Sequence, residues 1–509
     1  MNKPMHRAGR GKGLTLRRRV VWTVSAILFI SWGAPAANAF WQTVNSSNFA
    51  AAKADSLPQG STPAASPASA NVSVSWAAVT TPGAHAVAGY TIARYASASG
   101  GSKIAAGGGC AGTVSGLACT EQNVPDGTWY YTATPVIALW TGAESTRSTG
   151  VTVDVTAPTV SVTSVSPAPN GAGFNNSTPV TVNLGAVDNP GGTGVAAIKY
   201  TVDGGSTVVV NATTAAVNVS GNGTHTVSFF ATDVAGNSGA PQTQTIRIDT
   251  VAPGIPTISA PAYVNIANVA NVPVTGTAEA GASVVLTVTD PGAHTVTQTV
   301  SANGSGNWST TGLNLTSLTT DGLLSYSAVA RDAAGNTGQP GTATSTKDVA
   351  APTVSSITLA NSGGTGQQGR ASTGDTLTMV YSTDTAASTL CNSWSNSAAT
   401  QSATGTASIS ADDTLTFTSA SCTTPAIGSV KLIANYNSHA SQARSYAATV
   451  SWTKSTGTLV LTLNDGGTGG TRGDDSTLVA PVYTPAPGVA DTAGNPMTGT
   501  FTAGTLSGF

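Results

Sequence analysis

Charged side chains are scarce in this chain: Asp, Glu, Lys and Arg make up only 8% of its 509 residues. Ordinary soluble domains carry about 25%, and disordered segments typically carry a high net charge. The composition is therefore unlike that of an ordinary cytosolic protein or a disordered polyelectrolyte. Solubility must come from Ser, Thr and Asn, and the length allows roughly three to five domains.

The side chains that usually carry catalysis are also few. Beyond residue 39 the sequence has three Glu and four His, and no His lies in a pattern such as H-E-x-x-H. A glycosidase needs two placed carboxylates, whereas Asp412-Asp413 and Asp474-Asp475 lie in polar, turn-like segments. Neither G-x-S-x-G nor a phosphate-binding Gly loop that ends in Lys is present. These absences predict a protein that is not an enzyme, with no catalytic and no cofactor-binding residues.

Positive charge is concentrated at the N-terminus. Residues 1–39 hold seven Lys or Arg and no Asp or Glu, with an apolar run from Val20 to Trp32 and an A-x-A cleavage signal at Ala37-Asn38-Ala39. The run has 13 residues, whereas a membrane-spanning helix needs about 20. A cleaved signal peptide (1–39) is therefore favoured over a membrane anchor, and we expect a secreted or cell-surface protein.

Removing that segment leaves 20 − 7 = 13 cations against 22 anions, a net charge of −9 over 470 residues. Nucleic-acid binding would require a basic patch, which the remaining sequence lacks. It also contains no second long apolar run. We expect no nucleic-acid partner and no membrane span in the mature chain.

Cysteine is limited to four residues, and an even number in an exported chain favours disulfides. Cys110 with Cys119 would close a short loop, and Cys391 with Cys422 a longer one. A zinc site is the alternative, but the sequence has no C-x-x-C pair.

Two short motifs recur along the chain. Asp-x-x-Ala-Pro begins at Asp154, Asp249 and Asp348, at spacings of 95 and 99 residues. Asp-x-Ala-Gly-Asn begins at Asp233, Asp332 and Asp491, and its first two copies precede the next Asp-x-x-Ala-Pro by 16 residues. A period near 100 residues is the size of one immunoglobulin-type sandwich, so the motifs predict a tandem array.

The segments between the motifs alternate with period 2, as in Val72-Ser73-Val74-Ser75-Trp76, and are rich in Thr and Val. Gly, Asn, Asp and Pro cluster between these runs, and no helix-length window keeps a 3.6-residue period. The sequence therefore predicts an all-β protein built of tandem β-sandwiches.

The run Val74-Ser75-Trp76 is followed by Gly89 to Tyr95 and by Val124 to Tyr131. With these residues, segment 57–156 resembles a fibronectin type III domain. The resemblance implies that Trp76 is a core residue and that Tyr130 or Tyr131 is the tyrosine-corner residue. Cys110 and Cys119 depart from the family pattern.

The remaining segments carry other matches: Ile198 to Gly205, Ala231 to Asn237, Val274 to Ala282, Gly306-Asn307-Trp308 and Asp332 to Asn336. On these, residues 157–251 and 252–350 resemble bacterial Ig-like domains, the latter those of large surface adhesins. Residues 351–509 end similarly, in Asp491 to Pro496, and their length predicts a larger Ig-like sandwich with extra strands. Residues 40–56 are expected to form a linker.

The repeat motifs supply the candidate metal ligands. Ca²⁺ takes about six to eight oxygen ligands, and Ig-like adhesin arrays often hold calcium between domains. The resemblance therefore implies structural calcium at Asp233, Asp249, Asp332 and Asp348. Asp188, which precedes Asn189-Pro190, is a further candidate ligand. The alternative is that each Asp only caps a turn through backbone N–H groups.

Together these features predict a non-catalytic adhesin, stalk or scaffold: a monomeric rod that binds an unidentified cell-surface polysaccharide or protein. The alternative is an accessory carbohydrate-binding protein of polysaccharide degradation, because fibronectin type III modules accompany bacterial glycoside hydrolases. For that role Trp140 is the best candidate for an exposed sugar-stacking residue, although strand Trp residues more often pack in cores. A self-assembling matrix or pilus-like subunit is a third class.

Overall fold

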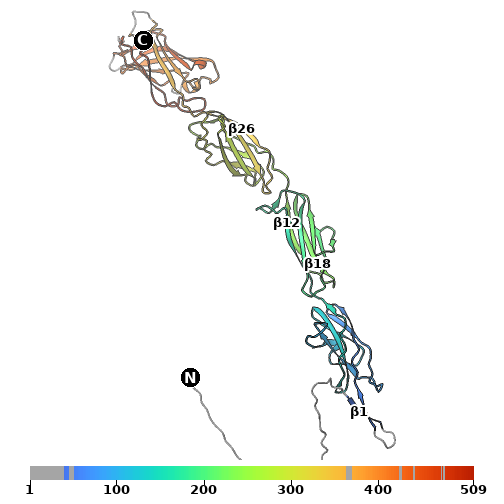
Figure 1. The fold of residues 1–509 in the computed structure, drawn as a ribbon. Coiled ribbons are helices and arrows are strands. Elements are labelled where there is room, and N and C mark those ends of the chain that lie inside the picture. The colour runs from blue at the N-terminus through green and yellow to red at the C-terminus, as the bar shows by residue number, and fades with distance from the viewer. Residues whose placement is uncertain are drawn as a thin grey trace, which may run out of the picture.

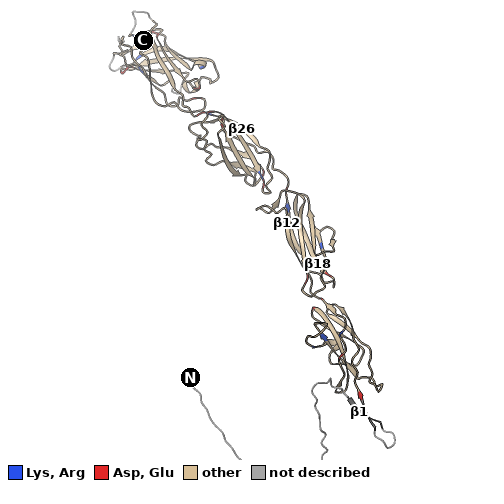
Figure 2. Ribbon diagram, viewed as in Figure 1, with Lys and Arg blue, Asp and Glu red and all other residues tan. Residues whose placement is uncertain are grey.

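The computed structural model describes residues 39–44, 51–362, 369–422, 427–438, 442–471, 473 and 476–509, with only the backbone for 39–44 and 51–54. Four β-domains follow one another along an extended rod (Figure 1). Charged residues are sparse along all four (Figure 2). The predicted all-β fold of tandem Ig-like sandwiches is confirmed. The predicted signal peptide lies outside the described residues apart from Ala39, and stays a prediction.

The first domain packs two sheets around Trp76, whose ring meets Tyr90 edge-on with 5.4 Å between centroids. Of the two candidate tyrosines, Tyr131 is fully buried and donates its hydroxyl to Glu121 Oε2 (2.8 Å). One sheet contains β3 (Ala64–Ala68), β4 (Asn71–Ser75) and β8 (Ala118–Glu121). The other contains β10 (Trp140–Thr141), β9 (Gly127–Ile137), β5 (Gly89–Tyr95) and β6 (Ile104–Ala105), with β7 (Thr113–Val114) and β11 (Val151–Val153) alongside.

Residues 40–56, expected to form a linker, contain most of a hairpin. β1 (Ala39–Val44) pairs antiparallel with β2 (Ala51–Ser56) at the start of the first domain (Figure 1). No helix in the described part of the chain is long and apolar enough to cross a membrane. The helical turns are short: η1 (Gly108–Cys110), α1 (Ala387–Leu390) and η2 (Lys454–Thr456).

In the second and third domains the strands bury alternate residues, as period 2 requires. The second domain packs two sheets against each other. One has the order β12 (Thr159–Ser166), β14 (Val180–Val187), β17 (Thr214–Val219). The other has the order β13 (Phe174–Asn175), β19 (Gln242–Ile248), β18 (Gly223–Asp233), β15 (Val195–Val202), β16 (Val208–Val210). The third pairs β21 (Thr275–Thr277) with β24 (Asn307–Ser309), and orders β20 (Tyr263–Val264), β26 (Gly341–Lys347), β25 (Gly322–Arg331), β22 (Ser283–Thr289) and β23 (Thr295–Ser301) in its larger sheet.

The fourth domain is one ten-stranded sheet that folds back around a single core, so that its end strands β27 and β36 contact each other. Trp452 is fully buried in this core and meets Tyr381 edge-on at 5.8 Å. The strand order is β27 (Val354–Ala360), β28 (Thr376–Tyr381), β33 (Thr458–Leu463), β32 (Arg444–Thr453), β29 (Thr400–Ile409), β30 (Thr414–Thr418), β31 (Ser429–Lys431), β35 (Val482–Thr484), β36 (Phe501–Thr502), with β34 (Thr468–Gly469) on β32.

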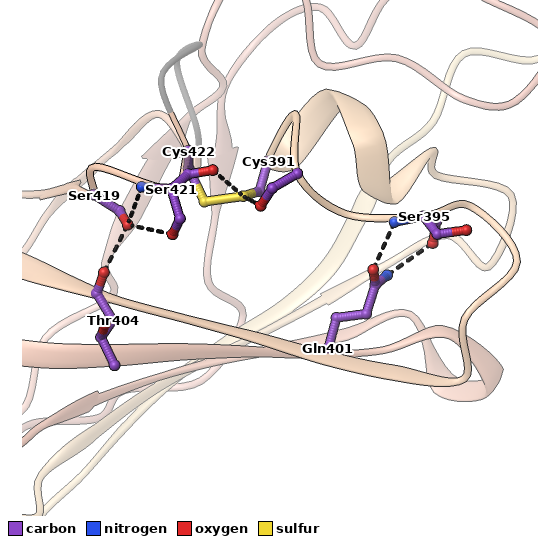
Figure 3. Close-up of a disulfide and its surroundings, with 8 residues drawn as sticks. Cys391, Ser395, Gln401, Thr404, Ser419, Ser421 and Cys422 are labelled. Carbon is purple, nitrogen blue, oxygen red and sulfur yellow. Dashed lines mark hydrogen bonds between the residues drawn. A yellow bond between two sulfur atoms is a disulfide. The ribbon is translucent and has the colours of Figure 1, made fainter.

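Both expected disulfides are present: Cys110–Cys119 and Cys391–Cys422. The second ties the segment after α1 to the loop after β30 in the fourth domain (Figure 3). Hydrogen bonds hold the two loops beside it. Ser419 Oγ donates to Thr404 O (2.6 Å), and Gln401 both accepts from Ser395 N (2.6 Å) and donates to Ser395 O (2.8 Å).

Removing each disulfide should destabilise its domain by an amount that follows loop length. The bridges close loops with sequence separations of 31 and 9 residues, and chain entropy then gives about 4 kcal/mol and about 2.5 kcal/mol. We expect Cys391→Ala/Cys422→Ala to lower the unfolding free energy of the fourth domain more than Cys110→Ala/Cys119→Ala lowers that of the first. Denaturant unfolding of the full chain measures both, and a larger loss from the shorter loop would contradict the expectation.

Candidate functional site

The two repeat motifs meet at every junction between domains. The Asn that ends Asp-x-Ala-Gly-Asn donates its side-chain N–H across the boundary to the backbone carbonyl of the Asp that opens the preceding Asp-x-x-Ala-Pro. The bonds are Asn237 to Asp154 O (3.1 Å), Asn336 to Asp249 O (2.8 Å) and Asn495 to Asp348 O (2.9 Å). We call this bond the junction clamp. It gives the Asp carbonyl of each linker a fixed donor from the next domain.

Each clamping Asn is oriented by its own motif. The amide nitrogen also donates to the Asp carboxylate four residues earlier, at 2.7–2.8 Å, and that carboxylate accepts the backbone N–H of the same Asn. The Gly before the Asn has φ between 89° and 97° in all three copies, a region that favours glycine. The motif is therefore a preformed turn that presents one amide N–H.

Sequence reasoning missed the residues that hold the other side of each linker. Asp126, Asn222 and Asp321 each precede a Gly that opens strand β9, β18 or β25, and each accepts the N–H of the residue after the linker Asp. The distances are 2.8, 2.9 and 3.4 Å. The signal was present as Asp/Asn-Gly at 28, 27 and 27 residues before the linker Asp. Each linker is thus bonded by both of its neighbouring domains.

Glycine also lets the linker approach closely. A Cβ at Gly239 would lie 2.5 Å from Pro158 O, and one at Gly338 would lie 2.5 Å from Pro253 O. Both glycines stand two residues after a clamping Asn, and both meet the Pro of the linker motif. The third junction has Met497 at this position.

Carboxylates gather at the first and third junctions. In each cluster the ligand atoms lie within 4.8 Å of one another: Asp154, Asp188 and Asp233 at the first, and Asp348, Asp384 and Asp491 at the third. The parts are equivalent: a linker Asp, an Asp from the loop after β14 or β28, and the Asp of the Asp-x-Ala-Gly-Asn turn. Asp154 and Asp384 were not among the predicted ligands, and Asp491 was predicted only as part of its motif.

One oxygen in each cluster has no protein partner. Asp188 Oδ1 and Asp384 Oδ1 are both buried without a hydrogen bond, and the neighbouring Asn189 Oδ1 is in the same state. Unpaired buried acceptors are costly, and a hard cation such as Ca²⁺ prefers carboxylate and amide oxygens. The donor set at these two junctions therefore fits such an ion.

The second junction is built differently. Asn336 donates there both to Asp249 O and to the Asp332 carboxylate. Neither Asp joins a three-carboxylate cluster among the described residues. Asn170 of the second domain donates to the carbonyls of Ala333 and Ala334 in the turn of the third, at 2.9 Å each. Asn265 makes the equivalent bond at the third junction, to Ala493 O (2.6 Å). The structure thus places the five predicted ligands at three junctions, two of them with a complete acidic cluster.

The two linker aspartates in the clusters have opposite pKa shifts. Burial alone would raise the pKa of Asp154, but hydrogen bonds from Thr193 and Thr156 outweigh it, so the pKa is lowered. Thr193 donates to Asp154 Oδ2 through both N and Oγ1, each at 2.7 Å. At the third junction, burial and repulsion from Asp491, Asp384 and Asp321 raise the pKa of Asp348. The third cluster therefore resists carrying its full negative charge.

The expected sugar-stacking candidate lies apart from the junctions. Trp140 is 41% exposed at the start of β10, beside Leu139, which is 98% exposed in the turn between β9 and β10. The first residues of β9 pair with β11, which precedes the first linker. Because β9 has 11 residues, the turn at its other end lies at the opposite end of the first domain. The two side chains form an apolar tip at that end.

No family model and no curated protein matches the sequence. Among solved structures the chain is similar to a tetra-tandem repeat in the extending region of a large adhesion protein, with 20% identity over 82% of this chain and 100% of the other, at a TM-score of 0.26. The FN1–FN3 domains of chicken CNTN1 are 14% identical over 57% of this chain and 98% of theirs (TM-score 0.24). Fibronectin(III)-like modules of Clostridium thermocellum CbhA are 17% identical over 38% and 87% (TM-score 0.19). At such identities the likeness concerns the fold alone.

Removing a junction clamp should loosen the rod at one point. Asn336→Ala deletes the donor to Asp249 O and leaves both that carbonyl and Asp332 Oδ2 short of a partner. We expect a loss of about 1–3 kcal/mol in the unfolding free energy of the third domain, and a smaller maximum dimension in small-angle scattering. Asn211→Ala, at an exposed position between β16 and β17 and outside the second junction, is the matched control. Equal scattering curves for the two variants would contradict the clamp.

The raised pKa of Asp348 predicts that its ionisation lowers the stability of the folded chain as pH rises. The folded chain keeps this proton to higher pH than the unfolded chain, whose ordinary value is 3.8. The favourable contribution is therefore present below about pH 4 and is lost as pH rises through the folded pKa. In chelator, Asp348→Asn should gain melting temperature relative to the parent chain between pH 4 and pH 7. Calorimetry at the two pH values checks this, and a constant difference would rule it out.

Proposed function

We propose that this protein is a secreted or cell-surface rod that acts as an adhesin, stalk or scaffold, without catalysis of its own. The junction clamp is the observation that carries the proposal, because the same bond recurs at all three boundaries. A bond that recurs at each boundary holds successive domains end to end, as a spacer requires. The two disulfides suit an oxidising, extracellular setting.

We further propose that Ca²⁺ stiffens the first and third junctions. Three carboxylates converge at each, and each has a buried oxygen without a partner. A bound cation would supply that partner and offset the mutual repulsion that raises the pKa of Asp348. No ion is proposed at the second junction, because no three-carboxylate cluster forms there among the described residues.

Calcium titration of the full mature chain tests the ion. We expect two sites by calorimetry, with Asp188→Asn and Asp384→Asn each abolishing one of them. Chelator should lower the melting temperature of the parent chain and lower it less in either variant. Glu279→Gln is the matched control, since Glu279 is exposed and follows β21 at the junction without a cluster. No heat of binding in the parent chain would remove calcium from the proposal.

Binding through surfaces is tested separately. Residues 40–509 are mixed with insoluble polysaccharides and with whole bacterial cell walls, and protein depletion and sugar release are measured together. Depletion without release supports a binding rod, and release of sugar would overturn it. The accessory carbohydrate-binding role is favoured by one observation, the exposed Trp140, so depletion by polysaccharide that Trp140→Ala abolishes would select that role.

A further inference from the structure

Strand β23 is an open edge of the larger sheet in the third domain. It pairs with β22 over seven residues, from Ser283 opposite Ser301 to Thr289 opposite Thr295, with no shift of register. On its other side, no backbone hydrogen bond within the described chain joins Thr295–Ser301 to another segment. The chain's own contact there is a side-chain bond, from Gln298 Nε2 to Thr311 O (2.9 Å) in the segment after β24. The row of backbone N–H and C=O groups is therefore left for a further strand.

This edge lacks the devices that usually protect one. Proteins block exposed edges with charged side chains, Pro, bulges or very short strands. β23 reads TVTQTVS, which has no charge and no Pro. Two other edges carry such a device: β12 has a bulge between Val162 and Ser164, and β3 contains Pro67. β16 is an uncharged edge of three residues only. β17 is uncharged too, but it is shorter and its sequence TAAVNV is not symmetric.

The sequence of β23 is nearly the same in both directions. Around Gln298 the flanking pairs are Thr297 and Thr299, Val296 and Val300, and Thr295 and Ser301. Antiparallel pairing of two identical strands about a two-fold axis places each residue opposite its mirror position. With the axis at Gln298, every Val would face a Val and every hydroxyl residue would face another.

We propose that β23 is a docking edge for a second copy of this chain, paired antiparallel with the two-fold axis at Gln298. Such pairing would form about six to eight backbone hydrogen bonds. Val296 and Val300 are half-buried and pack against the core of the third domain, so the partner strand would complete their cover. Thr297 and Thr299 lie on the exposed face, where Thr pairs across strands stabilise a sheet.

We expect the dimer formed through β23 to dissociate easily, because its interface is small. A single seven-residue edge covers far less than the ~1,200–2,000 Å² of a stable interface, so dilute chains remain monomeric rods. Crowded chains pair side by side through their third domains. This inference is independent of the proposed binding role, because it requires neither the external ligand nor calcium.

Sedimentation of the full mature chain over a wide concentration range tests the pairing. Thr297→Lys/Thr299→Lys places Lys opposite Lys at two positions and should weaken dimerisation at least about tenfold. Thr297→Lys/Thr299→Glu places opposite charges face to face and should keep or strengthen it. Both positions are exposed, so the melting temperature of the monomer should change little. Thr214→Lys/Ala216→Lys, on the exposed positions of β17, is the control and should leave dimerisation unchanged.

The register is tested by cross-linking. Gln298→Cys places two thiols opposite each other on the axis and should give a disulfide-linked dimer, whereas Thr295→Cys should not, because it faces Ser301 of the other copy. Charge-swap behaviour and selective cross-linking together support the proposal. A parent chain that stays monomeric at millimolar concentration would overturn it. So would a dimer that the double Lys change does not weaken.

Discussion

The bond from an Asn amide to the carbonyl of a linker Asp is the interaction on which the shape of this molecule depends. A linker between two sandwiches exposes backbone donors and acceptors that neither domain's sheets can satisfy. Here the next domain supplies a donor from the Asp-x-Ala-Gly-Asn turn, and the previous domain supplies an acceptor from the Asp/Asn-Gly pair. With both ends bonded and Pro limiting φ, the linker has few alternative paths, and the domains form a rod.

The strands and the domain period could be predicted from the sequence, because each depends on short sequence patterns. The period-2 runs predict the strands, and the spacing of Asp-x-x-Ala-Pro predicts a period of one domain. That Asn237 would contact Asp154, 83 residues away, could not be predicted from one sequence. The contact joins one copy of a motif to another across a domain, and nothing local distinguishes that partner from the nearer Asp249.

The acidic clusters also depend on tertiary contacts that the sequence alone does not predict. Asp188 was predicted as a ligand because it precedes an Asn-Pro pair, but Asp384 carries no such motif and was missed. Its place in the cluster comes from the way the loop after β28 folds towards the third linker, which is a property of the tertiary structure. Asp249 and Asp332 belong to the repeat motifs, yet no third carboxylate joins them among the described residues. A repeat motif thus predicts a junction more reliably than it predicts the ion at that junction.

The Cys391–Cys422 disulfide limits the extended length of the fourth domain under tension. The chain between these residues, a sequence separation of 31, is closed into a loop and cannot lengthen even if the fourth domain unfolds under tension. At ~3.4 Å per extended residue, this withholds roughly 100 Å of contour length. Under tension the fourth domain therefore yields less length per residue than the second and third domains, which contain no cysteine.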